Sequence, residues 1–242
     1  MHPMTSRLEQ PRLLAFDTST ERLAVAVVAG RQQWCALEDG GPRSSQRVLP
    51  LAFELMASAG IEPSTLDAVA FGRGPGAFTG LRTACSVAQG LALGLRRPVL
   101  PIDCLALVAE EARARHDVKS LWVTMDARMD EVYAGEYMWR GETWHAVVEP
   151  ALWTLPALNA RWQAAPPVEL AGSALAVFGE RLAAGTARRL PEIGEGRAEA
   201  LARLARGAWA RGEGIDAADA LPLYLRDKVA LTTAERAAAA AA

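Results

Sequence analysis

The sequence predicts an α/β protein with two lobes, in which a βββαβα unit occurs twice. Three observations predict this fold. Short runs of apolar and β-branched residues, typical of strands, alternate with longer runs that are typical of helices. The order of these runs in the first half of the chain returns in the second half. The first strand of each half also ends in an aspartate, Asp17 in one and Asp126 in the other.

In the first half, apolar runs bounded by turn residues predict the strands. These strands cover residues 13–16, 23–28, 33–37, 68–71 and 99–102. A helix is predicted over residues 44–59, because Ser44 or Ser45 can cap its start and Gly60 can end it. A second helix is predicted over about residues 79–95, and a linking helix over residues 105–115.

The second half repeats this order. The predicted strands cover residues 121–125, 131–139, 144–148 and 168–171, and the predicted helices cover residues 155–163, 173–184 and 195–211. Three strands followed by a crossover helix predict a mixed sheet faced with helices. The duplicated unit is the arrangement of the actin-like ATPase fold, also called the ASKHA or ribonuclease H-like fold. The expected divisions are an N-terminal extension (1–12), an N-terminal lobe (13–103), a C-terminal lobe (104–230) and an alanine-rich tail (231–242).

Composition excludes several classes of protein. The net charge is −2, whereas a protein that grips tRNA by itself carries a basic surface. The three cysteines have no metal-ligand spacing, and the three histidines include no pair at i and i+4, so we expect no metal site. No apolar stretch is long enough to span a bilayer and no apolar signal core stands near the start. We therefore expect a cytoplasmic protein without membrane contact.

A glycine cluster at residues 72–82 lies between a predicted strand and a predicted helix. Glycines let the backbone approach a ligand closely, and a helix start offers free N–H groups to an anion. The cluster is not a Walker loop, because no Gly-Lys-Ser/Thr follows it. The alternative is a tight structural turn with Thr79 as the helix cap. The candidate degenerate nucleotide or anion site comprises Asp17, Thr18, Ser19, Gly72, Gly74, Gly76 and Thr79.

The two helices of the first half have more apolar surface than one sheet face can cover. The helix after the glycine cluster is apolar nearly all round, which predicts burial on more than one side. We interpret the surplus as half of a helical interface with a partner; the alternative is that the other lobe covers it. The candidate interface residues are Val48, Leu51, Ala52, Leu55, Leu81, Ala84, Val87, Ala88 and Leu91.

Four further segments carry recognisable motifs: residues 70–82 with 88–92, residues 14–19, residues 126–133 and residues 223–226. They resemble the motifs of a known family, the TsaB family, also called YeaZ. The resemblance spans residues 13–230 and implies an actin-like fold. It implies a scaffold without a catalytic site or required cofactor, in the complex that transfers threonylcarbamoyl to N6 of the adenosine beside the tRNA anticodon.

The resemblance also implies the partners. The catalytic paralogue TsaD would dock through the two helices, the ATPase TsaE would complete the complex, and these partner subunits would use ATP and Mg²⁺. Alone, the chain would form a homodimer, and it would meet tRNA only through the complex. The alternative function is an ATP-dependent phosphotransferase, which would use Asp17 and the glycine cluster; Ser19, where such enzymes usually have glycine, argues against it.

Overall fold

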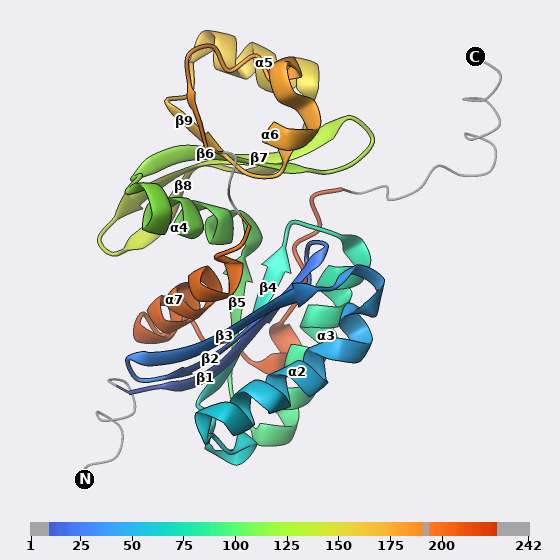
Figure 1. The fold of residues 1–242 in the computed structure, drawn as a ribbon, viewed down its shortest axis with the longest axis vertical. Coiled ribbons are helices and arrows are strands. Elements are labelled where there is room, and N and C mark those ends of the chain that lie inside the picture. The colour runs from blue at the N-terminus through green and yellow to red at the C-terminus, as the bar shows by residue number, and fades with distance from the viewer. Residues whose placement is uncertain (1–9, 191–193, 227–242) are drawn as a thin grey trace, which may run out of the picture.

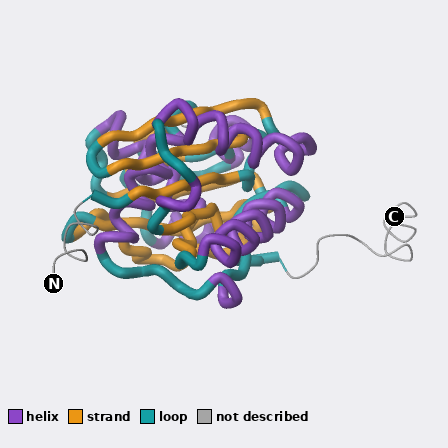
Figure 2. The backbone as a smooth tube through the Cα atoms, turned by 90° about the horizontal axis from the view of Figure 1, so that it is seen from below, coloured by secondary structure: helices purple, strands orange, loops and turns teal. Residues whose placement is uncertain are grey.

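The computed structural model describes residues 10–190 and 194–226, which form two lobes (Figure 1). The predicted alanine-rich tail lies outside the described residues. So does the predicted N-terminal extension, apart from residues 10–12, of which Arg12 already begins the first strand. Each lobe is built on one five-stranded mixed sheet, with helices packed on the strands (Figures 1 and 2).

The sheet of the first lobe has the strand order β3-β2-β1-β4-β5. Its strands are β1 (Arg12–Asp17), β2 (Arg22–Ala29), β3 (Gln32–Asp39), β4 (Ala68–Gly74) and β5 (Val99–Asp103). The first three strands form an antiparallel meander, while β4 pairs with β1, and β5 with β4, in parallel. The sheet is therefore mixed, as the order of three strands followed by a crossover helix predicts.

The sheet of the second lobe has the order β10-β9-β6-β7-β8, which repeats the topology of the first sheet. Its strands are β6 (Ser120–Asp126), β7 (Glu131–Arg140), β8 (Thr143–Thr154), β9 (Glu169–Ala171) and β10 (Arg188–Leu190). The repeat confirms the predicted duplication. Strand β10 was not predicted, because its three residues include two arginines and carry no apolar pattern.

The helices are α2 (Ser44–Ala59), α3 (Phe78–Leu95), α4 (Cys104–His116), α5 (Leu155–Ala164), α6 (Ala174–Phe178) and α7 (Arg197–Ala210). Helices α2 and α3 cover one face of the first sheet, and α7 covers the other (Figure 1). The alternation of strand side chains explains both layers. In β1, Leu14 and Phe16 pack under α2 and α3, whereas Leu13 and Ala15 pack under α7.

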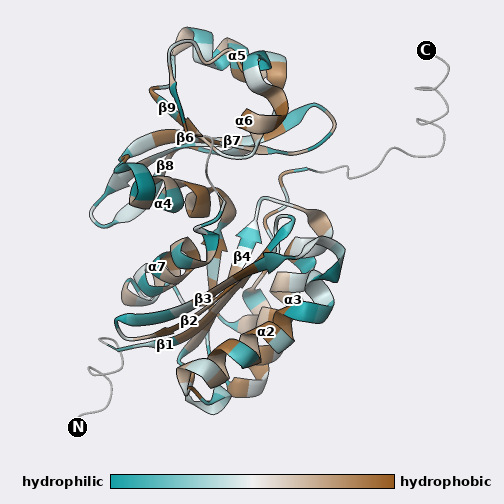
Figure 3. Cartoon of the chain, in the orientation of Figure 1, coloured by the Kyte–Doolittle hydropathy of each residue, from teal (hydrophilic) through white to brown (hydrophobic). Residues whose placement is uncertain are grey.

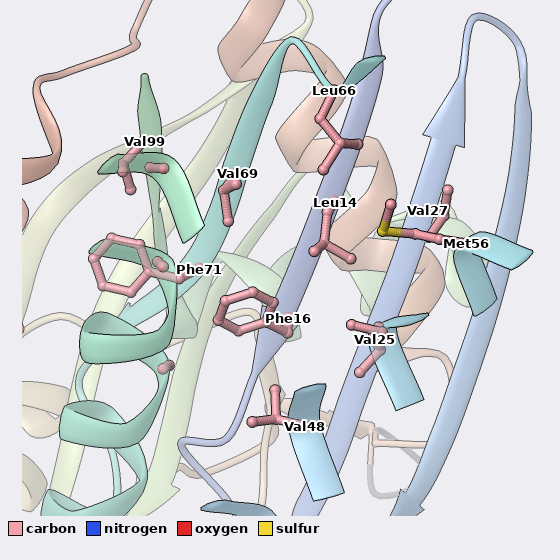
Figure 4. Packing of buried hydrophobic residues seen from close by; sticks show 14 of the residues in the cluster. Leu14, Phe16, Val25, Val27, Val48, Met56, Leu66, Val69, Phe71 and Val99 are labelled. Carbon is pink, nitrogen blue, oxygen red and sulfur yellow. The ribbon is translucent and has the colours of Figure 1, made fainter. Parts of the chain in front are cut away.

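The core under α2 and α3 is dense and aliphatic. Figure 4 shows Phe16 and Phe71 side by side on neighbouring strands, with Val48 and Met56 reaching down from α2. The central strands β1 and β2 are among the most hydrophobic segments of the chain (Figure 3). Such segments are typical of strands that are buried on both faces.

The last helix of each half packs against the sheet of the other half. Helix α4 follows β5 but packs in the core of the second sheet, and α7 follows β10 but packs on the first. Residue Ile215, after α7, also forms a bridge to Val99 of β5. The repeating unit is thus βββαβαβα. Helix α7, which belongs to the expected C-terminal lobe at residues 104–230, packs on the sheet of the first lobe.

Some predicted helix ends differ from the observed ones. Gly60 ends α2 in the left-handed conformation, as predicted. Neither helix start uses the predicted cap: α2 begins at Ser44 after Arg43, and Thr79 is already inside α3, which follows Ala77. Helix α6 stops at Phe178 and not near residue 184, and a short 3₁₀ turn follows. In the described part of the chain, no helix has both the length and the apolarity needed to cross a membrane.

Candidate functional site

Asp17 stands at the end of β1 and is fully buried. Its Oδ1 accepts a hydrogen bond from the backbone N–H of Ser19, and its Oδ2 accepts one from the Ser19 hydroxyl, both at 3.1 Å. Arg197, at the start of α7, donates from Nε to Oδ2 of Asp17 at 2.5 Å. Its Nη2 donates to the Ser19 hydroxyl oxygen at 2.9 Å. The carboxylate is therefore neutralised and held by the chain itself.

This pairing determines what Asp17 can do. A buried carboxylate is stable only with a counter-charge or a metal ion, and here a guanidinium takes that place. Within residues 10–190 and 194–226, no group of His, Cys, Asp and Glu side chains is arranged to hold a metal ion. Next to the pair, burial and then the charge of Asp17 raise the pKa of the Cys104 thiol well above its usual range. Cys104 is thus a neutral, inert thiol.

The glycine cluster packs against the turn after Asp17. A Cβ at Gly72 would lie 2.0 Å from Oδ1 of Asp17, and one at Gly80 would lie 1.8 Å from the carbonyl oxygen of Thr18. The hydroxyl of Thr18 also donates to the carbonyl of Gly80 at 2.6 Å. These two glycines are needed for contacts within the chain itself, so the cluster works as a tight junction at these positions.

The other predicted anion-site residues are spread along the same junction. Gly74, whose N–H donates to Cys104 Sγ, is buried, whereas Thr79 is exposed. Ser19 and Gly76 line a cleft between the lobes. The structure therefore brings Asp17, Thr18, Ser19, Gly72 and Gly76 together and leaves Thr79 on the surface.

The interlobe cleft has a volume of about 750 Å³. The first lobe contributes residues 19–22, Gly76 and Ala77 before α3, and Phe78 and Leu81 of α3. The second lobe contributes residues 125–129, and residues 223–226 of the C-terminal segment form a further wall. Most of these side chains are apolar or aromatic, and Arg197 closes the cleft beside Ser19.

The C-terminal segment at residues 220–226 ties the two lobes together. Its carbonyl at Ala220 accepts hydrogen bonds from the side chains of Cys85 and Gln89 of α3, and the N–H of Leu223 donates to the backbone carbonyl of Arg73. At its other end, Arg226 forms an ion pair with Glu131 of the second lobe at 2.6 Å.

The predicted interface residues lie mostly inside the first lobe. Val48, Leu51, Ala52, Leu81, Ala84 and Ala88 are buried, while Leu55, Val87 and Leu91 are half-buried. The buried side chains pack against their own sheet or the adjoining loops, so they offer no surface to a partner. The sequence could not show which side of α3 is buried, because both sides are rich in apolar and small residues.

The outer face of α2 and α3 has a different set of residues. Leu93 is 74% exposed and Phe53 is 45% exposed. Along α3, Ser86, Gly90 and Gly94 follow one another at intervals of four, all exposed. A Cβ added at Gly90 or Gly94 would meet no atom within 4 Å. Packing within the described chain does not require these glycines, although each weakens the helix by about 1 kcal/mol relative to alanine.

Arg197 is the important residue that the sequence did not indicate. It was expected only as part of an amphipathic helix over residues 195–211. No local pattern connects it with Asp17, which is 180 positions away. The signal that could have been noticed was an arginine at the start of a helix rich in alanine.

Comparisons with known proteins agree with these features. The family model described as "TsaD: tRNA N6-adenosine threonylcarbamoyltransferase" matches residues 38–187. A curated relative from Escherichia coli, the tRNA threonylcarbamoyladenosine biosynthesis protein TsaB, is 32% identical over 90% of this chain and 96% of its own. The Haemophilus influenzae protein of the same name is 42% identical over 50% of this chain and 51% of its own.

Solved structures extend the likeness to three dimensions. A Pseudomonas aeruginosa protein described as similar to peptidase YEAZ superposes with a TM-score of 0.81 and 39% identity, covering 89% of this chain and 100% of its own. A second Pseudomonas aeruginosa structure, described as YeaZ, gives a TM-score of 0.79 and 38% identity over the same shares. The duplicated sheets and these neighbours together establish the actin-like fold.

Proposed function

Because this chain belongs to the TsaB family, also called YeaZ, we propose that it is a non-catalytic subunit that scaffolds and activates a tRNA-modifying complex. Family membership supports a role in tRNA threonylcarbamoyladenosine biosynthesis. In this proposal the complex transfers threonylcarbamoyl to N6 of the adenosine beside the anticodon. The paralogue TsaD carries out the transfer, partner subunits use ATP and Mg²⁺, and this chain requires no cofactor.

The observation that carries the non-catalytic role is the pairing of Asp17 with Arg197. The Asp17 carboxylate ends β1 and accepts a hydrogen bond from Ser19, which lines the interlobe cleft; a catalyst would use such a carboxylate to bind a metal ion or activate a group. Here the carboxylate is buried against a guanidinium, and freeing it would leave an uncompensated buried charge. The chain is therefore equipped to support a catalyst and not to act as one.

The exposed face of α2 and α3 supports docking of the paralogue. Leu93 and Phe53 give apolar contact area, and Gly90 and Gly94 let a second helix approach closely. This face replaces the buried residues expected from the sequence, of which Leu55, Val87 and Leu91 keep some exposed surface at its border. A paralogue with the same fold would offer two equivalent helices, which gives a four-helix interface.

The remaining partners follow from the same assignment. The ATPase TsaE joins the complex of this chain with TsaD, and tRNA is held through the complex, since the net charge of −2 offers no basic surface of its own. When TsaD is absent, the α2 and α3 face pairs with a second copy. The complex works in the cytoplasm.

An ATP-dependent phosphotransferase is the alternative function. It would need Asp17 for Mg²⁺ and the glycine cluster for phosphates. Asp17 is already paired, and Gly72 and Gly80 are filled by contacts from residues 17 and 18. Among the described residues, no contact favours this alternative function.

A leave-one-out reconstitution tests the proposal. Unmodified tRNA, threonine, bicarbonate and ATP are combined with the synthase that makes threonylcarbamoyl-AMP, TsaD, TsaE and this chain. Mass spectrometry then detects modified adenosine. We expect modified adenosine only when both this chain and TsaD are present. The reaction that contains this chain but lacks TsaD should give none. Equal product without this chain would contradict the scaffold role.

A further inference from the structure

Four strands stand at the edges of the two sheets: β3, β5, β8 and β10. Three of them are protected against pairing with another chain. Strand β5 is bridged by Ile215, β8 contains Pro150 and has an irregular register with β7, and β10 has only three residues. A covering segment, a proline, a bulge and a short length are the usual protections of an edge strand. In the part of the chain that the structure describes, β3 has none of them over its eight residues.

The backbone of β3 has hydrogen-bonding groups without a partner strand. It pairs with β2 in one unbroken register, from Gln32 opposite Ala29 to Asp39 opposite Arg22. In an antiparallel pair, alternate residues direct their N–H and C=O groups away from the neighbouring strand. Those groups of β3 make no backbone hydrogen bond with any other described segment. The edge can therefore pair with a further strand.

The middle of this edge is apolar and only partly covered. Trp34 and Ala36 pack on the α2 side of the sheet, whereas Cys35 and Leu37 pack on the α7 side. All four side chains remain half-buried, and no charged residue interrupts them. A strand placed beside β3 would cover the apolar surface that these residues leave exposed.

The ends of β3 carry charges that complement a second copy of the same strand. Two copies related by a twofold axis run antiparallel, and each uses the same residues for the contact. With Cys35 at the centre, Arg31 of each copy faces Asp39 of the other. In this arrangement Gln32 faces Glu38, so no two acids lie opposite each other. Arg31 is exposed in the turn before β3, and the Asp39 side chain is 84% exposed.

These charges also select one register. Centring the pair on either neighbour of Cys35 removes both contacts between opposite charges, because Arg31 then faces Leu37 or Gly41 and not Asp39. Opposite charges directly across an antiparallel pair stabilise it, and like charges destabilise it. The register with Cys35 at the centre is therefore the favoured one.

We propose that the β3 edge of the first lobe pairs antiparallel with the β3 edge of a second copy of this chain, with Cys35 opposite Cys35. The sheets of the two first lobes then form one continuous sheet. The contact uses the same strand of both copies, so it closes at two copies and leaves neither β3 edge free. It is separate from the outer face of α2 and α3, and it does not rest on the proposed function.

The first experiment reverses the end charges, in chains that also carry Gly90→Arg to remove association through the outer face of α3. Arg31→Asp places acids opposite each other at both ends of the contact, and Asp39→Arg places arginines there. A mixture of the two variants restores opposite charges at both ends. We expect the mixture to dimerise at least about tenfold more tightly than either variant alone. Sedimentation velocity measures this.

Glu142→Arg is the matched control, because it reverses an exposed acid in the turn between β7 and β8 of the second lobe. It should dimerise as the Gly90→Arg chain does. No dimer of the Gly90→Arg chain up to about 0.1 mM, or equal affinity for the mixture and the single variants, would overturn the proposal. A loss with Glu142→Arg as large as that with Asp39→Arg would overturn it too.

The second experiment reads the register through a disulfide. Directly opposite residues of an antiparallel pair have Cα atoms about 4.5–5.5 Å apart, which a disulfide can span. Copper–phenanthroline with oxygen should oxidise the two Cys35 thiols to one disulfide, while oxygen is reduced. We expect a covalent dimer from the natural chain and none from Cys35→Ser, which keeps the buried Cys85 and Cys104. Absence of the Cys35–Cys35 peptide in mass spectrometry would contradict the register.

Amide hydrogen exchange of residues 32–39 identifies what covers the edge. A second copy protects the outward amides of β3 more strongly as the protein concentration rises. Protection that is the same at every concentration would assign the edge to another segment of the same chain. Outward amides that exchange freely at concentrations where a dimer forms would place the dimer contact elsewhere. Either result would overturn the proposal.

Discussion

Asp17 and Arg197 are 180 positions apart in the chain and are joined by a 2.5 Å hydrogen bond between Nε and Oδ2. The Asp17 carboxylate has no access to solvent, so its charge depends on this partner. We expect Arg197→Met to lower the free energy of unfolding by about 3–5 kcal/mol, the cost of leaving a buried charge unpaired. Urea denaturation followed by circular dichroism measures this change.

The matched control is Arg22→Met, which removes the ion pairs with the exposed carboxylates of Glu195 and Asp39. Exposed ion pairs contribute little, so this variant should lose less than about 1 kcal/mol. The double variant Asp17→Asn, Arg197→Met should recover part of the stability, because it no longer buries a charge. A single Arg197→Met variant as stable as Arg22→Met would show that Asp17 does not need its partner.

The thiol of Cys35 gives a second prediction for a single residue. Burial, followed by the charge of Glu199, raises its pKa to about 11. At about pH 8 the reactive thiolate should be roughly 100-fold rarer than for a cysteine with the ordinary value of 9.0. We expect alkylation by iodoacetamide to be slow there and to rise about tenfold per pH unit up to the pKa. Mass spectrometry of the Cys35 peptide checks this, and a rate that levels off near pH 9 would contradict it.

At the scale of elements, α3 has two faces with different roles. Its inner face, with Ala84 and Ala88, packs on the sheet, and its outer face carries Gly90 and Gly94. We expect Gly90→Arg to abolish binding of TsaD and of a second copy to this outer face, because the long side chain blocks close helix approach. The same change should raise stability by roughly 0.5–1 kcal/mol, since glycine is a poor helix residue. Pull-down, sedimentation and thermal melting measure these effects.

Ala160→Arg on the exposed side of α5 is the control for Gly90→Arg, because it adds the same charge to a helix far from α3. It should keep both interactions. Ala88→Arg would not test the interface, because Ala88 is fully buried and a charge there would disrupt the core. If Gly90→Arg still binds TsaD as the natural chain does, the interface lies elsewhere.

At the scale of the whole molecule, the first lobe is incomplete without the end of the chain. Helix α7 covers the face of the first sheet opposite α2 and α3, where Leu13, Ala15 and Val28 are fully buried. We therefore expect residues 10–103 alone to aggregate or to remain without a cooperative unfolding transition, because that apolar face is uncovered. Thermal melting and proton NMR dispersion provide the measurement.

Residues 10–226, which contain every element described here, form the matching control and should unfold cooperatively. A sharp transition for residues 10–103 would mean that the first lobe is an independent folding unit. In that case the first lobe would fold without α7, and the packing of α7 on the first sheet would not be needed for its stability.

Apart from β10, the sequence by itself determined the order of strands and helices, the duplication and the end of α2 at Gly60, because these depend on short-range periodicity and turn chemistry. It also placed the glycine cluster at a strand-to-helix junction. Each of these features depends on residues that lie close together in the sequence. The family motifs predicted the actin-like fold, and the two sheets of matching topology confirm it.

The tertiary structure alone decided which side of α3 faces the sheet, where α7 packs, and that Arg197 neutralises Asp17. A helix that is apolar nearly all round has no pattern that selects its buried face. A pair separated by 180 residues has no periodic signature either. Both depend on how distant segments share one core, and that is why the candidate interface moved from the buried residues to the outer face with Gly90 and Leu93.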